Sequence, residues 1–242
     1  MNLTLYASLT TVLLAPMPGL AMDLPSSFDL RDIDGHSFIG AVRDQAYCGS
    51  CYAFGTLAAA ESTWNRTHGL YDQQAIDLSE AFMVWSLSPL YDGMDGCDGG
   101  LLEDPMTAMV EHGTPLESVY PYPVQEDQWT VIEQPAGQHW DAPRYTMEDW
   151  YSIPVNDVET TRRVLHAIGA VTIGVNSDRE EWHDYQGGIL NDNFRVPTQV
   201  NIAALDHAVA LIGYNDETGE DGLGYWILRN SSSLAHLLRS RH

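Results

Sequence analysis

The chain contains no lysine, and its eleven basic residues, all arginines, are outnumbered by 34 Asp and Glu residues. The formal net charge of the 242 residues is therefore −23 at pH 7. Nucleic acids and anionic membrane surfaces both bind proteins through basic residues. The composition therefore argues against a nucleic acid and against a membrane surface as partners.

Long apolar runs are also missing, since none reaches the roughly 18 residues of a membrane-spanning helix. The first 21 residues carry no charge, contain an apolar stretch over Leu3–Leu14 and end in Gly19-Leu20-Ala21. This pattern predicts a signal peptide over residues 1–21, cut after Ala21, although its usual positive start is missing. We therefore expect an exported protein, extracellular, periplasmic or endo-lysosomal according to its source. The alternative is a buried N-terminal strand.

Cysteine is scarce, with only Cys48, Cys51 and Cys97. In an exported protein an odd count predicts one disulfide and one free thiol. Three cysteines with scattered histidines do not give the paired spacing of a four-ligand zinc site, and we expect no metal. Cys48 and Cys51 alone also fit a redox C-x-x-C pair at a helix start.

The chain can bury a hydrophobic core, because 44% of its residues are hydrophobic. We expect a helical subdomain over about residues 35–118, a strand-rich subdomain over about 119–231, and an atypical tail over 232–242. The Tyr120-Pro121 step marks the boundary, since proline does not continue a helix. The expected helices and strands are Ser50–His68, a short helix from Ser79, Leu101–His112, Asp157–Ile168, Val171–Val175, Tyr185–Leu190, Ala208–Tyr214 and Tyr225–Leu228.

Cys51 lies in the first turn of an expected helix that Ser50 precedes. The free N–H groups and the dipole of a helix N-terminus favour an anion, which predicts a lowered pKa for this thiol. A thiolate is a nucleophile for acyl transfer, and a histidine can take up its proton and return it to the leaving group. The candidate is His207, which precedes an apolar strand.

Two side chains complete this hypothesis. Asn230 follows a second strand, and its amide can fix the tautomer of His207. Gln45 lies six residues before Cys51, and its amide, with the Cys51 N–H, can form an oxyanion hole. Asp206 precedes His207 as a charged neighbour.

These residues and their surroundings resemble the papain family of cysteine proteases, over roughly residues 24–231. Tyr52, where most members have Trp, is similar to dipeptidyl peptidase I and its relatives. The sequence blocks that carry the resemblance are Leu24-Pro25, Phe28-Asp29-Leu30-Arg31, Cys48-Gly49-Ser50-Cys51-Tyr52, Leu78-Ser79-Glu80, Gly96-Cys97-Asp98-Gly99-Gly100, Tyr120-Pro121-Tyr122, Tyr185-Gln186-Gly187-Gly188-Ile189-Leu190 and Asp206-His207-Ala208.

The resemblance implies an α+β, papain-like fold with a cleft between a helical and a β-barrel-like subdomain. By this resemblance the catalytic residues are Gln45, Cys51, His207 and Asn230. It also implies a Cys48–Cys97 disulfide, and a substrate-binding role for Gly99, Gly100 and Asp206.

The C-terminus departs from the family pattern. Ser232 stands where the family has a Trp that shields the His–Asn pair, and we expect the last barrel strand to be missing. A reading-frame error, a fragment and a degenerate homologue all explain this departure. The expected signal peptide runs directly into Leu24-Pro25 without the inhibitory propeptide of the family, so we expect either an enzyme that folds without a propeptide or a sequence that is short at this point.

The predicted function is a cysteine peptidase that acts on peptides or proteins through a thiolate–imidazolium pair, without a cofactor. We expect a monomer that protein inhibitors can bind. The alternative is a catalytically impaired, protease-like peptide-binding protein. Subsite preference and endo- or exopeptidase action stay open.

Overall fold

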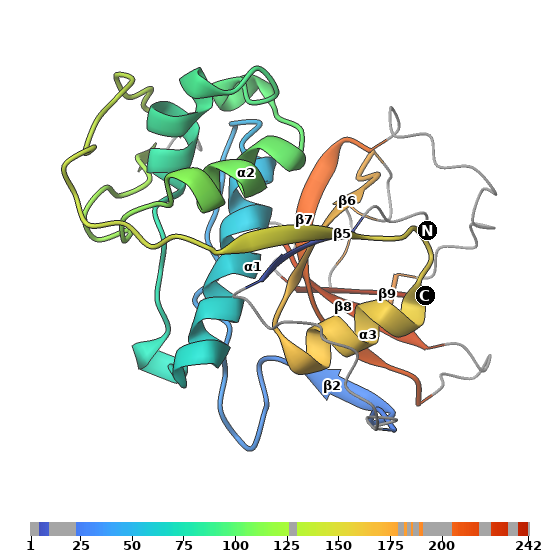
Figure 1. The fold of residues 1–242 in the computed structure, drawn as a ribbon. Coiled ribbons are helices and arrows are strands. Elements are labelled where there is room, and N and C mark those ends of the chain that lie inside the picture. Colours follow the sequence, from blue (N-terminus) through green and yellow to red (C-terminus); the bar gives the residue numbers. More distant parts are fainter. Residues whose placement is uncertain are drawn as a thin grey trace.

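The computed structural model describes residues 5–9, 23–125, 130–178, 205–217, 224–231 and 237–241, together with 182, 185, 189 and 190. Its main feature is a long central helix, α1, between a helix-rich half and a twisted β-sheet (Figure 1). The helices are α1 (Cys51–His68), α2 (Glu103–Glu111) and α3 (Val158–Ala167), with short 3₁₀ turns at Asp72–Gln74, Ser88–Leu90 and Gly96–Asp98 and a π-helical segment at Phe82–Leu87. The strands are β1 (Leu5–Leu9), β2 (Ser27–Asp29), β3 (Val124–Gln125), β4 (Thr130–Val131), β5 (Asp149–Ile153), β6 (Val171–Val175), β7 (His207–Asn215), β8 (Tyr225–Arg229) and β9 (Leu237–Arg241).

Helix α1 begins and ends where the sequence predicts. Four alanines and one leucine favour helix here, and Gly69 ends it in the left-handed conformation, with φ 64°. Ser50 precedes the first turn, but its side chain does not cap the helix. Instead its hydroxyl lies 2.8 Å from the Tyr122 hydroxyl, so Ser50 links the helix start to the helix-rich half.

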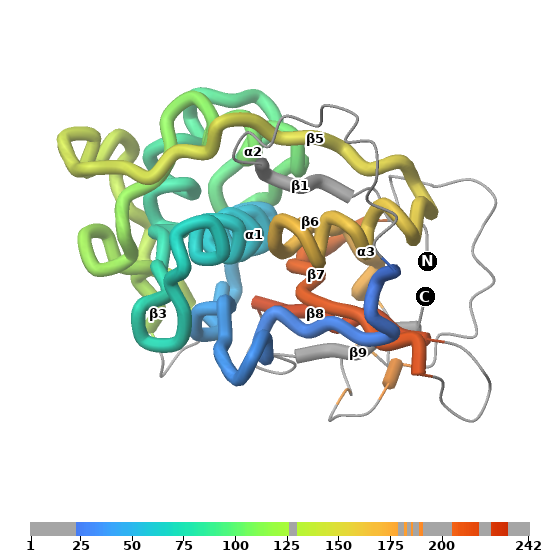
Figure 2. The backbone as a smooth tube through the Cα atoms, turned by 60° about the horizontal axis from the view of Figure 1, so that its bottom comes forward, coloured from blue at the N-terminus to red at the C-terminus, as the bar shows by residue number. Residues whose placement is uncertain are grey.

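The described strands of the main sheet run in the order β5-β1-β6-β7-β8-β9, and β2 also pairs with β7. All of these pairings are antiparallel. β7 is almost wholly buried between β6 and β8, as its apolar sequence predicts. In Figure 2, α3 lies in front of the sheet and next to α1, with β5 above it in the view and β8 below it.

The C-terminal prediction was wrong in one respect. A strand does follow β8, because β9 pairs with β8 from Arg229↔Leu237 to Tyr225↔Arg241. The sequence of β9 carries two arginines and little β-branched character, which concealed it. Ser232 lies outside the described residues, as do residues 186–188 of the predicted strand at 185–190.

The N-terminal segment is a strand in this structure. β1 lies between β5 and β6, with Leu5 opposite both Ile153 and Ile173. This is the arrangement that the alternative to a signal peptide predicts. The sequence analysis also missed β5, which alternates between exposed and buried residues only in part.

Two apolar clusters lie on opposite sides of α1. One, built on β6, β7, β8 and α3, includes Ala58 and Ala59 of α1. The other, built on the Phe82–Leu87 segment and α2, includes Tyr52 and Leu57. α1 is therefore the shared wall of both cores, and its N-terminal end emerges where the two halves meet.

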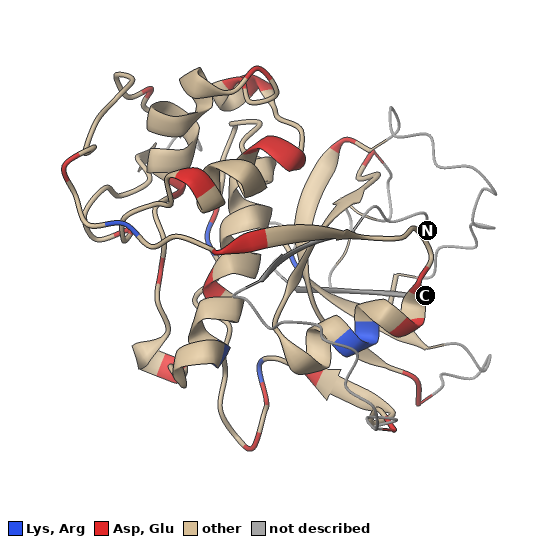
Figure 3. Ribbon diagram, viewed as in Figure 1, with Lys and Arg blue, Asp and Glu red and all other residues tan. Residues whose placement is uncertain are grey.

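Acidic side chains are spread over both halves, on α2, on α3 and on the connecting loops, whereas arginines occur at few points (Figure 3). Of the helices described, none has the length and apolarity to cross a membrane. No group of three or more His, Cys, Asp or Glu side chains suited to a metal ion occurs within the described part of the chain.

Candidate active site

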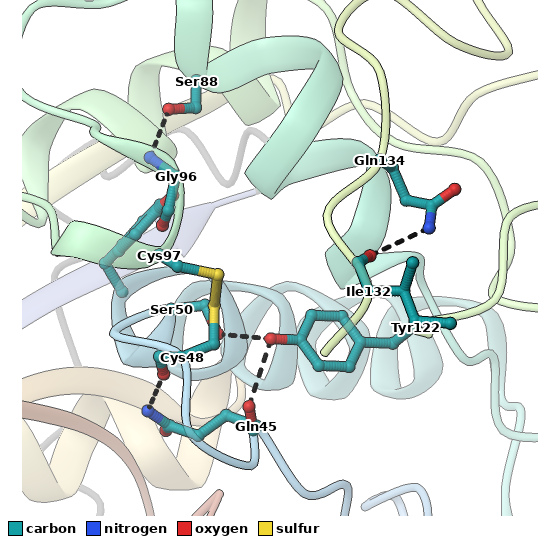
Figure 4. Close-up of a disulfide and its surroundings, with 10 residues drawn as sticks. Gln45, Cys48, Ser50, Ser88, Gly96, Cys97, Tyr122, Ile132 and Gln134 are labelled. Atoms are coloured by element: carbon teal, nitrogen blue, oxygen red, sulfur yellow. Dashed lines mark hydrogen bonds between the residues drawn. A yellow bond between two sulfur atoms is a disulfide. The ribbon is translucent and has the colours of Figure 1, made fainter. Parts of the chain in front are cut away.

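The loop before α1 is fixed from several sides. Cys48 and Cys97 form a disulfide (Figure 4). The Gly49 N–H donates to the Cys97 carbonyl at 2.7 Å. A Cβ at Gly49 would lie 2.6 Å from that carbonyl oxygen, so the close approach requires glycine. Cys51 is the free cysteine and follows directly in the first turn of α1.

Gln45 is held across the gap between the two halves. Its backbone N–H donates to the Ser231 carbonyl at 2.9 Å, and its Oε1 accepts from the Ser231 hydroxyl at 2.5 Å. Its Nε2 donates to the Cys48 carbonyl at 2.8 Å (Figure 4). A side-chain amide nitrogen has two hydrogens, so one N–H of Gln45 is left for another acceptor.

Tyr122 supports this loop, and sequence analysis assigned it no role at the site. Its hydroxyl donates to the Gln45 carbonyl at 3.2 Å and therefore accepts from the Ser50 hydroxyl, 2.8 Å away (Figure 4). In the sequence, the Tyr120-Pro121-Tyr122 block marked a boundary and contributed to the family resemblance, without a role at the site. Its second function is to tie the Gln45 loop to the start of α1.

His207 and Asn230 meet at one end of the sheet. His207 is the first residue of β7 and Asn230 directly follows β8, which pairs with β7 in antiparallel register. The His207 Nε2 lies 2.6 Å from the Asn230 Oδ1. The same Oδ1 accepts from the Ser231 N–H at 2.9 Å, which fixes it as the oxygen of the amide. His207 must then carry its hydrogen on Nε2 when it is neutral, which leaves Nδ1 as the basic nitrogen.

The Cys51 thiol lies beside this pair. The backbone N–H of Ala208, the residue after His207, is a hydrogen-bond partner of the thiol. A Cβ at Gly55, one turn further along α1, would lie 3.4 Å from the backbone of Ala208 and Val209, so α1 approaches β7 closely here. The contact between α1 and β7 thus brings Cys51 to the end of β7 where His207 stands.

The predicted lowering of the thiol pKa was wrong for this geometry. Burial raises the pKa of Cys51, and this effect outweighs the N–H groups of Ala208, Tyr52 and Cys51 itself. Burial also lowers the pKa of His207, against the Asn230 hydrogen bond and the charge of Asp206, which raise it. Both directions favour the neutral thiol and the neutral imidazole in the free protein. The sequence shows the helix N-terminus but not the depth at which the thiol lies.

The two predicted substrate-binding glycines adjoin the disulfide. Gly99 has φ 117°, which only glycine adopts readily. A Cβ at Gly100 would lie 2.8 Å from the ring of Tyr52, so glycine at this position lets the Tyr52 ring pack directly against the backbone. Gly100 itself is exposed, and its backbone faces solvent beside Cys51's helix.

Asp206 has a structural task in addition to its charge. Its carboxylate accepts from the N–H and hydroxyl of Ser177, at 2.6 and 3.0 Å, and from the Asp178 N–H at 3.1 Å. These contacts hold the segment that follows β6. Its charge raises the pKa of His207, although less than burial lowers it.

Trp182 is a further side chain that sequence analysis missed. Its ring lies edge-on to His207, with centroids 5.9 Å apart, and packs against the sheet core. A tryptophan five residues before the Gly187-Gly188 pair was the available signal in the sequence. It covers the imidazole from the side of the strand-rich half.

This constellation, on an α+β fold with a free cysteine at a helix start and a His–Asn pair at a sheet end, defines the class of papain-like folds. Residues 24–233 match the model of the papain family of cysteine proteases, and the chain belongs to that family.

Proteins with similar sequences include two cathepsins. The chain is 29% identical over 216 residues to cathepsin L of Sarcophaga peregrina, covering 89% of this chain and 57% of that protein. It is 30% identical over 210 residues to cathepsin L1 of Drosophila melanogaster, covering 86% of this chain and 50% of that protein. The chain therefore spans about half the length of these relatives.

Solved structures share the fold. The Carica candamarcensis cysteine protease CMS1MS2, solved in complex with E-64, superposes with a TM-score of 0.68 at 24% identity and 90% coverage of both chains. The digestive procathepsin L 3 of Tenebrio molitor superposes with a TM-score of 0.72 at 24% identity, covering 92% of this chain and 66% of that one. The papain-like α+β prediction is confirmed.

Proposed function

We propose that this chain is a cysteine peptidase in which Cys51 attacks peptide carbonyls and His207 transfers the proton. The observation that carries the proposal is the 2.6 Å contact between His207 Nε2 and Asn230 Oδ1, at the end of β7 where the Ala208 N–H meets the free thiol of Cys51. That contact leaves Nδ1 of His207 to accept a proton. A histidine with a purely structural role would not need a fixed tautomer next to a free cysteine.

The proposed reaction has two halves. The Cys51 thiol gives its proton to His207 Nδ1, and the sulfur forms a bond to the peptide carbonyl carbon. The carbonyl electron pair moves onto oxygen, then returns as the C–N bond breaks, and His207 protonates the leaving amine. Water, deprotonated by His207, then attacks the thioester and releases the acid and the thiol. Since both groups are neutral at rest, the ion pair forms by this internal transfer.

Gln45 is the proposed oxyanion donor, together with the Cys51 N–H. Its Nε2 already donates to the Cys48 carbonyl, and its Oε1 is held by Ser231, so the amide plane is fixed. Fixed donors stabilise developing charge without reorganisation. An extended peptide would pair with the exposed backbone at Gly99 and Gly100, near Asp206 on the opposite wall.

A second candidate is a peptide-binding protein with lost or weak turnover. It is favoured by the raised pKa of the Cys51 thiol, because a neutral thiol is a poor nucleophile. The fold and the cleft residues would be the same in both cases. Turnover therefore decides between them.

The test is hydrolysis of a panel of dipeptidyl fluorogenic amides by the purified protein, with Cys51→Ser as the control. The serine variant should lose at least about 10⁴-fold in kcat, as expected for removal of a nucleophile. A peptidyl epoxide should add its mass to Cys51 in the wild type alone. A folded wild-type protein with no turnover and no label would favour the binding protein.

The maturation of the chain is part of the proposal. Residues 1–21 act as a signal peptide, and residues 22–242 form the peptidase with its helical and strand-rich subdomains. The enzyme works as an exported monomer on peptides or proteins, and protein inhibitors bind its cleft. N-terminal sequencing of the exported protein tests the cut after Ala21, which would remove β1 from the sheet.

A further inference from the structure

A small cavity next to Asn230 is lined by residues of α1, β7 and the end of β8. Its lining includes Glu80, Arg229, Asn230 and Ser231 as polar residues, with apolar walls from Phe54 and Val209. The space for the centre of a water-sized sphere is about 10 Å³. An internal water needs roughly 10–15 Å³ by this measure, together with two to four polar partners. The cavity is therefore of the size for a single water.

Asn230 brings an unused donor to this cavity. Its Oδ1 accepts from both His207 and Ser231, so the orientation of the amide is set at that end. Its Nδ2 is buried and has no hydrogen-bond partner within the described part of the chain. A buried donor without an acceptor is unfavourable, and nearly all such groups in folded proteins have a partner in protein or water.

Glu80 brings the matching oxygen. The residue is 2% exposed, and its Oε2 has no partner among the described residues. Its pKa lies well above the ordinary range, through burial first and then through the charges of Glu61 and Glu117. A neutral carboxyl group offers one O–H donor and one acceptor oxygen, so it can bind a water in either sense.

Other charged groups near Glu80 are already engaged. Glu61 of α1 accepts from Arg229 of β8 at 3.2 Å and from the Leu78 N–H at 2.8 Å. Glu117 accepts from the Tyr122 N–H at 2.8 Å through Oε1; its Oε2 has no partner among the described residues, but Glu117 does not line the cavity. Arg43 also lines the cavity and is paired with Asp77. Glu80 and Asn230 are thus the two cavity-lining residues with an unpartnered buried polar atom in the described structure.

We propose that one internal water binds in this cavity between Glu80 Oε2 and Asn230 Nδ2, and that Glu80 is thereby a positioning residue for the His207–Asn230 pair. The kinetic effect of the water rests on the proposed function, whereas the water site itself does not. The water holds the nitrogen end of the Asn230 amide while His207 and Ser231 hold the oxygen end. Without it, the amide can turn away from His207 to find an acceptor.

The decisive variants are Glu80→Leu, which removes the polar group, and Glu80→Gln, which keeps a donor and an acceptor at similar size. Glu80→Leu should lower kcat about tenfold at little-changed KM, the scale expected for one lost buried hydrogen bond. Because the Asn230 bond raises the pKa of His207, its loss should also move the acid limb of kcat to lower pH. Glu80→Gln should keep the wild-type kcat within about twofold.

The matched control is Thr114→Val, which removes another buried unpartnered polar atom, the Oγ1 of Thr114, away from this cavity. It should leave kcat and the acid limb unchanged. Wild-type kinetics in Glu80→Leu, or an equal loss in Glu80→Gln and Glu80→Leu, would overturn the positioning role.

A high-resolution crystal structure of the wild-type protein tests the water directly and does not depend on the variants folding. Density for a water within hydrogen-bonding distance of Glu80 Oε2 and Asn230 Nδ2 supports the proposal, and an empty cavity overturns it. If the wild type shows no Cys51-dependent hydrolysis, the proposed function fails, while the density still decides whether the water site exists.

Discussion

The two walls of the candidate site are held in different ways. The wall that carries Cys51 is fixed by the Cys48–Cys97 disulfide, by the start of α1 and by hydrogen bonds between the 45–51 loop and Cys97, Tyr122 and Ser231. The wall that carries His207 and Asn230 is fixed by the pairing of β7 with β8 and by one hydrogen bond between side chains 23 residues apart. The first wall thus depends on one covalent cross-link and a few hydrogen bonds around a single loop, and the second depends on the packing of the whole sheet.

The largest expected effect is on the first wall. Replacing both Cys48 and Cys97 by Ala removes a cross-link between residues 49 positions apart. A loop of that length corresponds to about 4 kcal/mol of stability in the chain-entropy account. We expect a lowered Tm and a lower denaturant midpoint, measured by circular dichroism.

Cys51→Ala is the matched control, since it removes a thiol without removing a cross-link. Its unfolding midpoint should stay near that of the wild type. Equal stability of the double variant and the wild type would show that the Gly49–Cys97 backbone contact holds this wall by itself.

On the second wall, Asn230→Ala should lower kcat by roughly 10- to 100-fold, with KM nearly unchanged. The reason is that His207 loses the acceptor that fixes its tautomer and its ring. Steady-state kinetics on a fluorogenic dipeptidyl amide measure the effect. Asn215→Ala, at the far end of β7, is the control and should not change kcat; a similar loss there would point to general damage to the sheet.

The contrast between the walls also explains what the sequence predicts. Gln45, Cys48 and Cys51 lie in one short segment, so their spacing alone predicts a loop followed by a helix start. α1 and β7 were predicted with boundaries within one residue, because their apolar patterns are long and continuous. The papain-like class follows separately, because ordered sequence blocks of the chain resemble that family.

The sequence does not predict how deeply a side chain is buried or which strands pair with one another. The raised pKa of Cys51 depends on how far α1 is sunk against β7, which no local pattern encodes. β5 and β9 are identified by their partners rather than by their own residues. Trp182 and Glu80 approach the His207–Asn230 pair through tertiary packing alone.

Trp182 offers a smaller test of the second wall. Trp182→Ala should lower kcat about two- to tenfold, because the aromatic contact with His207 contributes on the order of 0.5–1.5 kcal/mol and excludes water from the imidazole. Trp182→Phe should restore most of the activity.

The control is Trp64→Ala, which removes a comparable Trp–His stack, with centroids 4.1 Å apart, near the far end of α1. We expect no kinetic change from it. If both alanine variants lose activity equally, the Trp182 contact has no specific role at the site.

The smallest expected effect is a shift in the pH dependence of activity, which tests whether burial against the sheet sets the pKa of His207. His207 must be neutral to accept the Cys51 proton, and burial lowers the pKa of His207 below the ordinary 6.5. Activity should therefore persist as pH falls through 6.5 and be lost only below it, measured as the acid limb of kcat/KM. Since the charge of Asp206 raises the pKa of His207, Asp206→Asn should move this limb to still lower pH. An acid limb at or above 6.5, or a shift to higher pH in Asp206→Asn, would mean that burial against the sheet does not set the proton affinity of His207.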